Sequence, residues 1–217
     1  MNAPRQIIKT SNLPFPVALW DDLASVDPFR AASKAGGFYN QGVFTIDFLN
    51  APYLIDTAAK CIVAPEGCSK VSLNKSLVLL VYLFTCGKTE PPAPAGRLVG
   101  PMEIPGGAMF FRGPHALPTP PLAKAFGHNS QALTEKALAL GAERESDPKA
   151  LFKWQVLPKI EIALYFDEAD DEFEAFCQYG FDAHIHFYLP LDAIWALTNV
   201  VTAELLISGC PFTNVNV

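Results

Sequence analysis

The strongest constraint on the fold is a two-residue alternation of apolar and polar side chains in the last third of the chain. The alternation covers residues 160–167, resumes over residues 173–179 after an acidic turn, and is followed by residues 181–189, which also alternate. Because successive side chains of a strand point to opposite faces, this pattern predicts three consecutive strands. Strands that follow one another through tight turns predict an antiparallel, three-stranded meander.

A second β-rich region lies in the first third of the chain. Apolar residues 43–49 and 53–55 flank Asn50-Ala51-Pro52, and this arrangement predicts a hairpin. Residues 61–64 are expected to add a third short strand.

Helical periodicity and capping residues occur around these β regions. Residues 73–86 are apolar on nearly all sides, which is typical of a helix buried in a core, and Gly87 is expected to end it. Further helices are predicted over residues 17–26, 29–34, 122–126, 130–140 and 192–207. The fold class is therefore predicted to be α+β, with an antiparallel sheet made from the C-terminal meander and the N-terminal hairpin. About four to five helices are expected to pack on it.

Proline and glycine dominate residues 88–121. A linker between domains would hold few large apolar residues, yet this segment contains Leu98, Met102, Ile104, Met109, Phe110 and Phe111. We therefore expect an ordered loop packed against the body, with a short strand at residues 108–111, and ordered loops of this length are often functional. The expected organisation is an N-terminal extension, a single α+β domain and a C-terminal tail, at residues 1–16, 17–209 and 210–217.

The net charge of the chain indicates which classes of partner it is suited to bind. A net charge of −6 argues against a nucleic-acid backbone or an anionic membrane as the main partner. The longest apolar run, residues 77–84, is far shorter than the ~20 residues that cross a bilayer, and no apolar stretch of signal-peptide length follows the N-terminus. We therefore expect a cytoplasmic protein. The cysteines lack a C-x-x-C pair and are expected to be free thiols, at Cys61, Cys68, Cys86, Cys177 and Cys210.

Asp182, His184 and His186 carry the sharpest chemical signal in the sequence. Spaced two residues apart on the third predicted strand, they would project from one face together with Tyr188. Two imidazoles and a carboxylate are a ligand set for Zn²⁺ or Fe²⁺ that leaves open coordination positions. The same pattern also fits a strand face that is solvated or lines a ligand site.

The other motifs are less specific. Arg112 and His115 follow a Gly-Gly turn and would suit an acidic ligand, although isolated surface cations explain them equally well. Acidic residues 167–174 lack the spacing of an EF-hand loop and are expected to form a solvated turn. The chain has no phosphate-binding glycine loop and no G-x-S-x-G nucleophile motif. No motif therefore fixes an activity.

Several segments, taken in order, resemble a bacterial and archaeal family known as domain of unknown function 3786. They are Leu23 with Asp27-Pro28, the strand pair at residues 44–56, Glu103-Ile104-Pro105-Gly106-Gly107-Ala108, residues 121–129, Leu157-Pro158 with the acidic hairpin, and Phe181-Asp182-Ala183 with Tyr188-Leu189-Pro190. The family has no established activity. The resemblance implies a link to anaerobes and to corrinoid or iron–sulfur proteins. The chain lacks the cysteine-rich iron–sulfur segment of some members and departs from the family at His184 and His186.

Three functions are consistent with these features. The first is an accessory protein of anaerobic metabolism that binds a small ligand or cofactor between residues 103–115 and the face with Asp182, His184 and His186. The cofactor would be a corrinoid or other tetrapyrrole, an iron–sulfur partner or a divalent metal. The second is a metal-dependent hydrolase or oxidoreductase that uses the Asp-x-His-x-His set, with Glu161 or Tyr188 in proton transfer. The third is a structural protein that contacts a partner through an exposed apolar patch.

Overall fold

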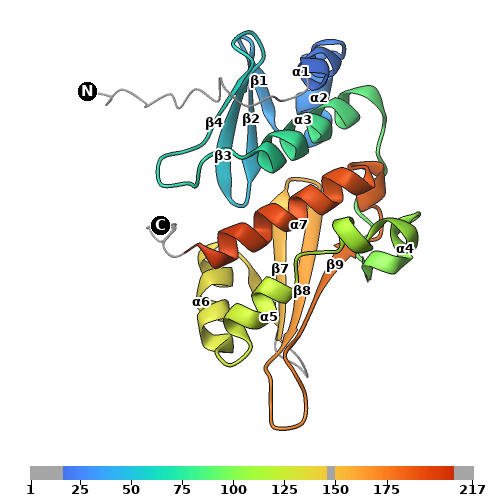
Figure 1. Cartoon of the computed structure of the whole chain (residues 1–217). Helices are drawn as coiled ribbons and strands as arrows, with labels where there is room; N and C mark the ends of the chain where they lie inside the picture. The colour runs from blue at the N-terminus through green and yellow to red at the C-terminus, as the bar shows by residue number, and fades with distance from the viewer. Residues whose placement is uncertain (1–16, 146–149, 208–217) are drawn as a thin grey trace.

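The computed structural model describes residues 17–145 and 150–207 of the chain. These residues form two antiparallel sheets connected and covered by helices (Figure 1). The strand order is β1-β2-β3-β4 in the first sheet and β5-β9-β8-β7-β6 in the second. The α+β class is therefore confirmed. The predicted hairpin and the predicted meander lie in two separate sheets, however, and not in one.

The first sheet contains the predicted hairpin. Its strands are β1 (Phe38–Asn40), β2 (Val43–Phe48), β3 (Ala51–Asp56) and β4 (Cys61–Val63). Phe48 lies opposite Ala51, so the turn is Leu49-Asn50, one residue earlier than the sequence suggests. Both turn residues have a positive φ, which asparagine adopts more readily than most side chains.

The second sheet contains the meander at a shifted position. Its strands are β5 (Leu98–Val99), β6 (Glu143–Glu145), β7 (Ala150–Leu157), β8 (Ile160–Asp167) and β9 (Phe176–Asp182). The prediction for β8 is confirmed, whereas β7 has no counterpart among the predicted strands. The strand predicted from residue 173 begins at Phe176, because the Asp170 carboxylate accepts the N–H groups of Glu172 and Phe173 and extends the acidic turn.

The strand predicted over residues 181–189 is wrong beyond its second residue. The β9 strand ends at Asp182, and the chain then turns into a short 3-10 helix, η3 (Ile185–Phe187). The Asp182 carboxylate accepts the N–H of His184, two residues further on, at 2.8 Å. This contact is typical of a turn that an aspartate side chain closes on its own backbone, so the chain cannot stay extended.

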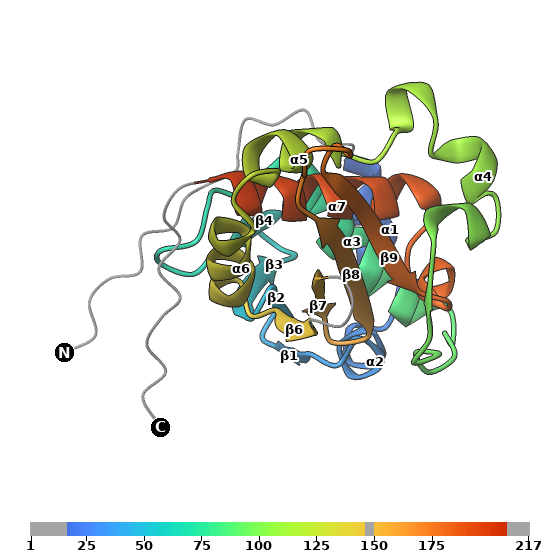
Figure 2. The same cartoon turned by 90° about the horizontal axis from the view of Figure 1, so that it is seen from below.

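The six predicted helical segments are confirmed. They are α1 (Val17–Ala24), α2 (Pro28–Ala35), α3 (Leu73–Lys88), α5 (Pro120–Phe126), α6 (Ser130–Ala139) and α7 (Leu191–Leu206). Figures 1 and 2 show α7 crossing the molecule, and α7 packs against α3, α5 and α6. None of the described helices is long and apolar enough to cross a membrane.

Gly87 does not end α3 as predicted, since the helix continues to Lys88. A Cβ atom at this position would lie 2.7 Å from Cγ2 of Val26 and 3.0 Å from Cβ of Ala31. The glycine therefore allows α2 and α3 to pack closely, which explains why a residue that disfavours helices stands inside one.

The segment between α3 and α5 contains β5 and three short helical turns. These are η1 (Pro101–Glu103), α4 (Gly107–Phe110) and η2 (Gly113–His115). The strand predicted over residues 108–111 is wrong, because Gly106 takes a positive φ of 79° and starts the α4 turn. Ile104 and Phe111 are buried at 2% and 5% exposure, so the segment packs against the body.

Both sheets contribute to one continuous cluster of buried apolar side chains. Fully buried aromatic residues come from β2, α3, β7 and β9, namely Phe44, Tyr82, Trp154 and Phe181. The sheets also meet through the backbone, because the N–H of Leu49 donates to the carbonyl of Val156 at 3.0 Å. The two halves of the described chain therefore share their hydrophobic core.

Candidate functional site

Asp182 is buried at the end of β9, where β9 pairs with β5. Its carboxylate accepts the N–H of Ala95 at 2.9 Å and the N–H of Gly96 at 2.8 Å, in addition to the N–H of His184. Charge-assisted bonds to backbone N–H groups are among the stronger hydrogen bonds in proteins. Asp182 therefore fixes the proline-rich segment before β5 to the end of the sheet.

Two more of the predicted site residues bind the same segment. Nδ1 of His184 donates to the carbonyl of Ala93 at 2.8 Å, and the Tyr188 hydroxyl donates to the carbonyl of Pro92 at 2.6 Å. Burial raises the pKa of Tyr188, which keeps its hydroxyl protonated as a donor. Asp182, His184 and Tyr188 thus all bind one segment, and their partners are backbone groups of residues 92–96.

His186 does not share this environment. Its Nδ1 atom is buried without a hydrogen-bond partner among the described residues, and its ring packs on Phe187 with centroids 4.1 Å apart. The prediction that Asp182, His184 and His186 project from one strand face is wrong, because these residues are not in a strand beyond Asp182. Across residues 17–145 and 150–207, no group of three or more His, Cys, Asp or Glu residues has a geometry that could hold a metal ion.

This geometry gives an expected result for metal content. We expect the double variant His184→Ala/His186→Ala, purified without oxygen, to hold the same amount of transition metal per chain as the unaltered protein, because neither ring belongs to a ligand cluster. Elemental analysis by mass spectrometry measures this directly. One equivalent of zinc or iron in the unaltered protein that is lost in the variant would contradict the expectation.

Arg112 and His115 lie at the other end of the long segment. The His115 ring stacks on Phe110 with centroids 4.4 Å apart and meets the Trp195 ring edge-on at 5.8 Å. Among the described residues, no hydrogen bond, ion pair or ring contact joins Arg112 or His115 to Asp182, His184 or His186. The structure therefore does not unite the two predicted halves of the ligand site.

Further contacts fix this end of the segment to the sheet and to α7. Phe111 stacks on Phe181 of β9 with ring planes 9° apart, and Nε1 of Trp195 donates to the carbonyl of Ala116 at 3.3 Å. The Thr202 hydroxyl of α7 donates to the carbonyl of Pro118 at 3.2 Å. We call residues 91–118 the braced loop, because both of its ends are bound by buried side chains.

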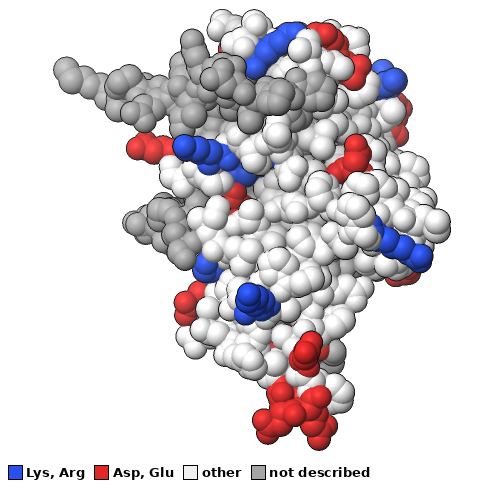
Figure 3. Space-filling model, viewed as in Figure 1, with Lys and Arg blue, Asp and Glu red and all other residues white. Residues whose placement is uncertain are grey.

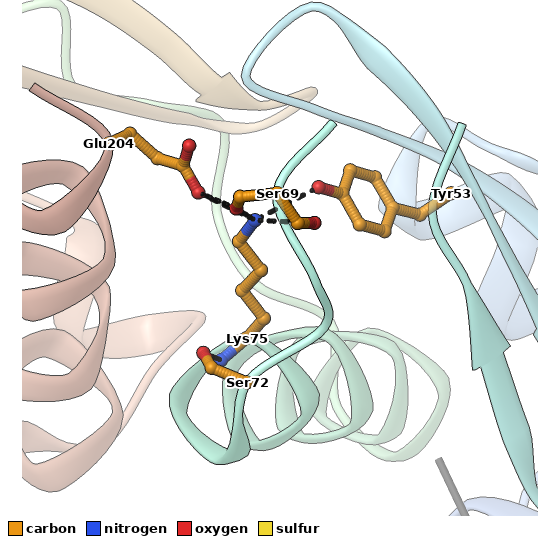
Figure 4. Close-up of polar contacts among 5 residues, drawn as sticks. All are labelled: Tyr53, Ser69, Ser72, Lys75 and Glu204. Carbon is orange, nitrogen blue, oxygen red and sulfur yellow. Dashed lines mark hydrogen bonds and ion pairs between the residues drawn. The ribbon is translucent and has the colours of Figure 1, made fainter. Parts of the chain in front are cut away.

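A second polar site, which the sequence analysis did not identify, joins α3 to α7. Nζ of Lys75 lies 2.6 Å from Oε1 of Glu204, and both side chains are at least nine-tenths buried (Figure 4). The ammonium group also donates to Oγ of Ser69 at 2.6 Å and to the Tyr53 hydroxyl at 3.2 Å. The Ser69 hydroxyl donates to the same Glu204 carboxylate. The charges of this buried pair are therefore compensated by one another and by two hydroxyls.

The pocket beside this ion pair is small. Its lining combines the polar group with apolar side chains, namely Phe48, Leu49, Ala51, Tyr53, Cys68, Ser69, Lys75, Leu140 and Glu204. The cavity volume is about 10 Å³, which is close to the space that one water molecule requires. The pocket is too small for an organic ligand in this conformation. Its polar side chains instead connect β3 and α3 of the first half of the chain with α7 near its end.

The surroundings of Cys86 and Cys177 favour the protonated form of both thiols. Burial raises the pKa of each to about 12, so the nucleophilic thiolate is scarce. The prediction of free thiols is confirmed for Cys86 and Cys177. Cys210 lies outside the described residues.

Comparison with models of protein families finds a match over most of the chain. A family model described as "Domain of unknown function (DUF3786)" matches residues 27–204, which include every helix and strand from α2 to β9 and most of α7. The match also contains Asp182, the braced loop and the Lys75–Glu204 pair. No curated protein and no solved structure matches the chain.

Proposed function

The chain belongs to the family of the domain of unknown function DUF3786, and on this premise we propose that it is an accessory protein that binds a partner protein through the braced loop. The proposal keeps the accessory role that the sequence suggests. It replaces the small ligand with a protein, because the polar groups of Asp182, His184 and Tyr188 bind backbone groups of residues 92–96.

The proposal rests on one observation: buried side chains fix both ends of the braced loop, while methionine side chains between them are exposed to solvent. Buried Asp182 and Tyr188 fix residues 92–96, and buried Phe111 fixes the other end. Between these anchors, Met102 is 53% exposed and Met109 is 80% exposed. A loop whose backbone is already held loses little backbone entropy when it binds, and methionine side chains adapt to the shape of an apolar surface, which favours recognition.

The chemistry of the loop indicates the kind of surface it would recognise. Met109 and Arg112 are three residues apart around the α4 turn, and η1 with Met102 packs against α4. Arg112 is exposed and has no ion pair within the described part of the chain. Methionine and arginine are enriched at protein interfaces. The partner is therefore expected to offer an apolar groove for the methionines with a carboxylate beside it.

The position of the loop also favours contact with a large partner. Figures 1 and 2 show α4 and its flanking turns at the margin of the molecule, beside α7 and β9. Figure 3 shows a broad surface with few charged side chains over the middle of the same face. A protein approaching the loop would therefore meet little charge that must be desolvated.

Site-specific photo-crosslinking in the source cells tests the proposal. With p-benzoylphenylalanine in place of Met109, we expect one adduct of defined mass, because the side chain would lie in the partner's groove. The matched control carries the same group in place of Phe173, which is 70% exposed on the acidic hairpin. The adduct is expected to disappear when Arg112→Glu is added. Equal labelling from both positions, or no adduct from position 109, would overturn the proposal.

A further inference from the structure

The outer strands of the two sheets differ in how they are protected against pairing with another strand. On β6, all three residues are charged and exposed, namely Glu143, Arg144 and Glu145. The β5 strand has only two residues and is followed by Gly100-Pro101, and β4 is followed by Ala64-Pro65. Charges, short strands and proline are devices that natural proteins use to prevent edge-to-edge association.

β1 has neither charge nor proline. It is the outer strand of the first sheet and pairs with β2 on one side. Residues 36–42 around it, Gly-Gly-Phe-Tyr-Asn-Gln-Gly, contain no charged side chain. Phe38 is 78% exposed, and Phe29 of α2, which is 68% exposed, packs edge-on against Tyr39 at 5.2 Å. Two phenyl rings therefore border an edge whose outer backbone groups have no strand partner among the described residues.

We propose that β1 pairs with β1 of a second copy of this chain, in an antiparallel arrangement about a two-fold axis that extends the first sheet. In an antiparallel ladder a strand is complementary to itself, so one segment supplies both sides of the interface. In the register centred on Tyr39, each Phe38 lies across from Asn40 of the other copy. The rings of Phe29 and Tyr39 from both copies meet on the opposite face.

The charge distribution favours a second copy over a different partner. A symmetric interface brings identical residues close together, so any charge in its centre would face a like charge. The chain has a net charge of −6, yet the seven residues around β1 carry none. This edge is thus a place where two copies approach without like-charge repulsion between opposed strands.

The size of the contact indicates a weak dimer. Four largely exposed phenyl rings would bury about 600 Å² of apolar surface, which is below the range of about 1,200–2,000 Å² for stable complexes. We therefore expect association with a Kd of about 10–100 µM, so that monomers dominate at 1 µM and dimers at several hundred micromolar.

Sedimentation velocity on the full chain tests the proposal between about 1 and 500 µM, a range set by the expected Kd. The weight-average mass is expected to rise from 23.6 kDa toward twice that value. Phe38→Glu is expected to weaken association at least tenfold, since it removes an apolar contact and brings charge into the centre of the interface. Because Phe38 is exposed, this variant should keep the circular dichroism spectrum and melting temperature of the unaltered protein.

The control is Phe173→Glu, which introduces the same charge at an equally exposed phenylalanine on the acidic hairpin. It should associate as the unaltered chain does. The inference is overturned if the protein stays monomeric throughout the concentration range, or if Phe38→Glu and Phe173→Glu have the same effect. Neither result depends on the braced loop, so this test is independent of the proposed function.

Discussion

Replacing Glu204 by leucine while Lys75 stays in place is expected to lower the free energy of unfolding by about 3–5 kcal/mol. The side chains of Lys75 and Glu204 are 4% and 7% exposed, so the variant leaves an ammonium group in the core without its counter-charge. Urea unfolding followed by tryptophan fluorescence measures the loss. Lys75→Met should have an effect of similar size, because it leaves the carboxylate unpaired instead.

The double variant Lys75→Met/Glu204→Leu separates the cost of an unpaired charge from the contribution of the pair. Because two apolar side chains of similar volume need no compensation, we expect its stability to return to within about 1 kcal/mol of the unaltered protein or to exceed it. The control is Lys153→Met, which breaks a pair of equal N–O distance, 2.6 Å, with Glu145 at the surface. Its effect should stay below about 1 kcal/mol. If Glu204→Leu lowers the free energy of unfolding by no more than Lys153→Met does, the Lys75–Glu204 pair is hydrated in solution.

Replacing Asp182 by alanine is expected to have the second large effect, a loss of about 3 kcal/mol or more in the free energy of unfolding. Three backbone N–H groups, of Ala95, Gly96 and His184, lose their common acceptor at a position that is 3% exposed. Hydrogen exchange followed by mass spectrometry should show faster exchange in peptides that cover residues 92–97. Peptides from β2 and β3 should be unchanged.

Comparing Asp182→Asn with Asp182→Ala tests whether the loss of stability is due to the carboxylate. Asp182→Asn keeps one acceptor oxygen but turns an amide N–H₂ toward backbone donors, so its effect should lie between those of the unaltered protein and Asp182→Ala. Asp56→Ala is the control, because Asp56 accepts one N–H, from Ala59, at the surface. Its effect should stay within about 1 kcal/mol. If exchange in residues 92–97 were the same in Asp182→Ala as in the unaltered protein, the loop would be held by other contacts.

The parts of the fold that follow from local pattern are predictable from the sequence. The α3 helix is apolar on nearly every side, and the β2–β3 hairpin has clear strands on either side of its turn, so short segments specify both. The β7 strand was predictable in the same way, because buried Phe152, Trp154 and Val156 alternate with Lys153 and Gln155. A period-two pattern therefore marks this strand in the sequence.

The candidate site was less predictable, because its contacts join residues far apart in the sequence. The chemistry of Asp182, His184 and Tyr188 makes them candidates in the sequence, but only the fold shows that they bind backbone groups of residues 92–96. The alternation after Asp182 was misleading, since an aspartate that bonds its own backbone overrides a strand pattern. Lys75 and Glu204 offer a weaker signal: each is a charged residue in a helix that is mostly apolar.

The distance along the chain between the braced loop and its anchor has a consequence for synthesis. Gly96 and Asp182 are 86 residues apart, so the loop leaves the ribosome long before the carboxylate that fixes it. During translation, Met102 and Met109 are therefore present on a segment that cannot yet take its final shape. A nascent chain ending near residue 170 would expose this loop to proteases and chaperones, whereas one that includes β9 and α7 would protect it. The braced loop is thus among the last parts of the molecule to reach its final conformation, and the surface proposed to bind a partner is complete only after β9 has been synthesised.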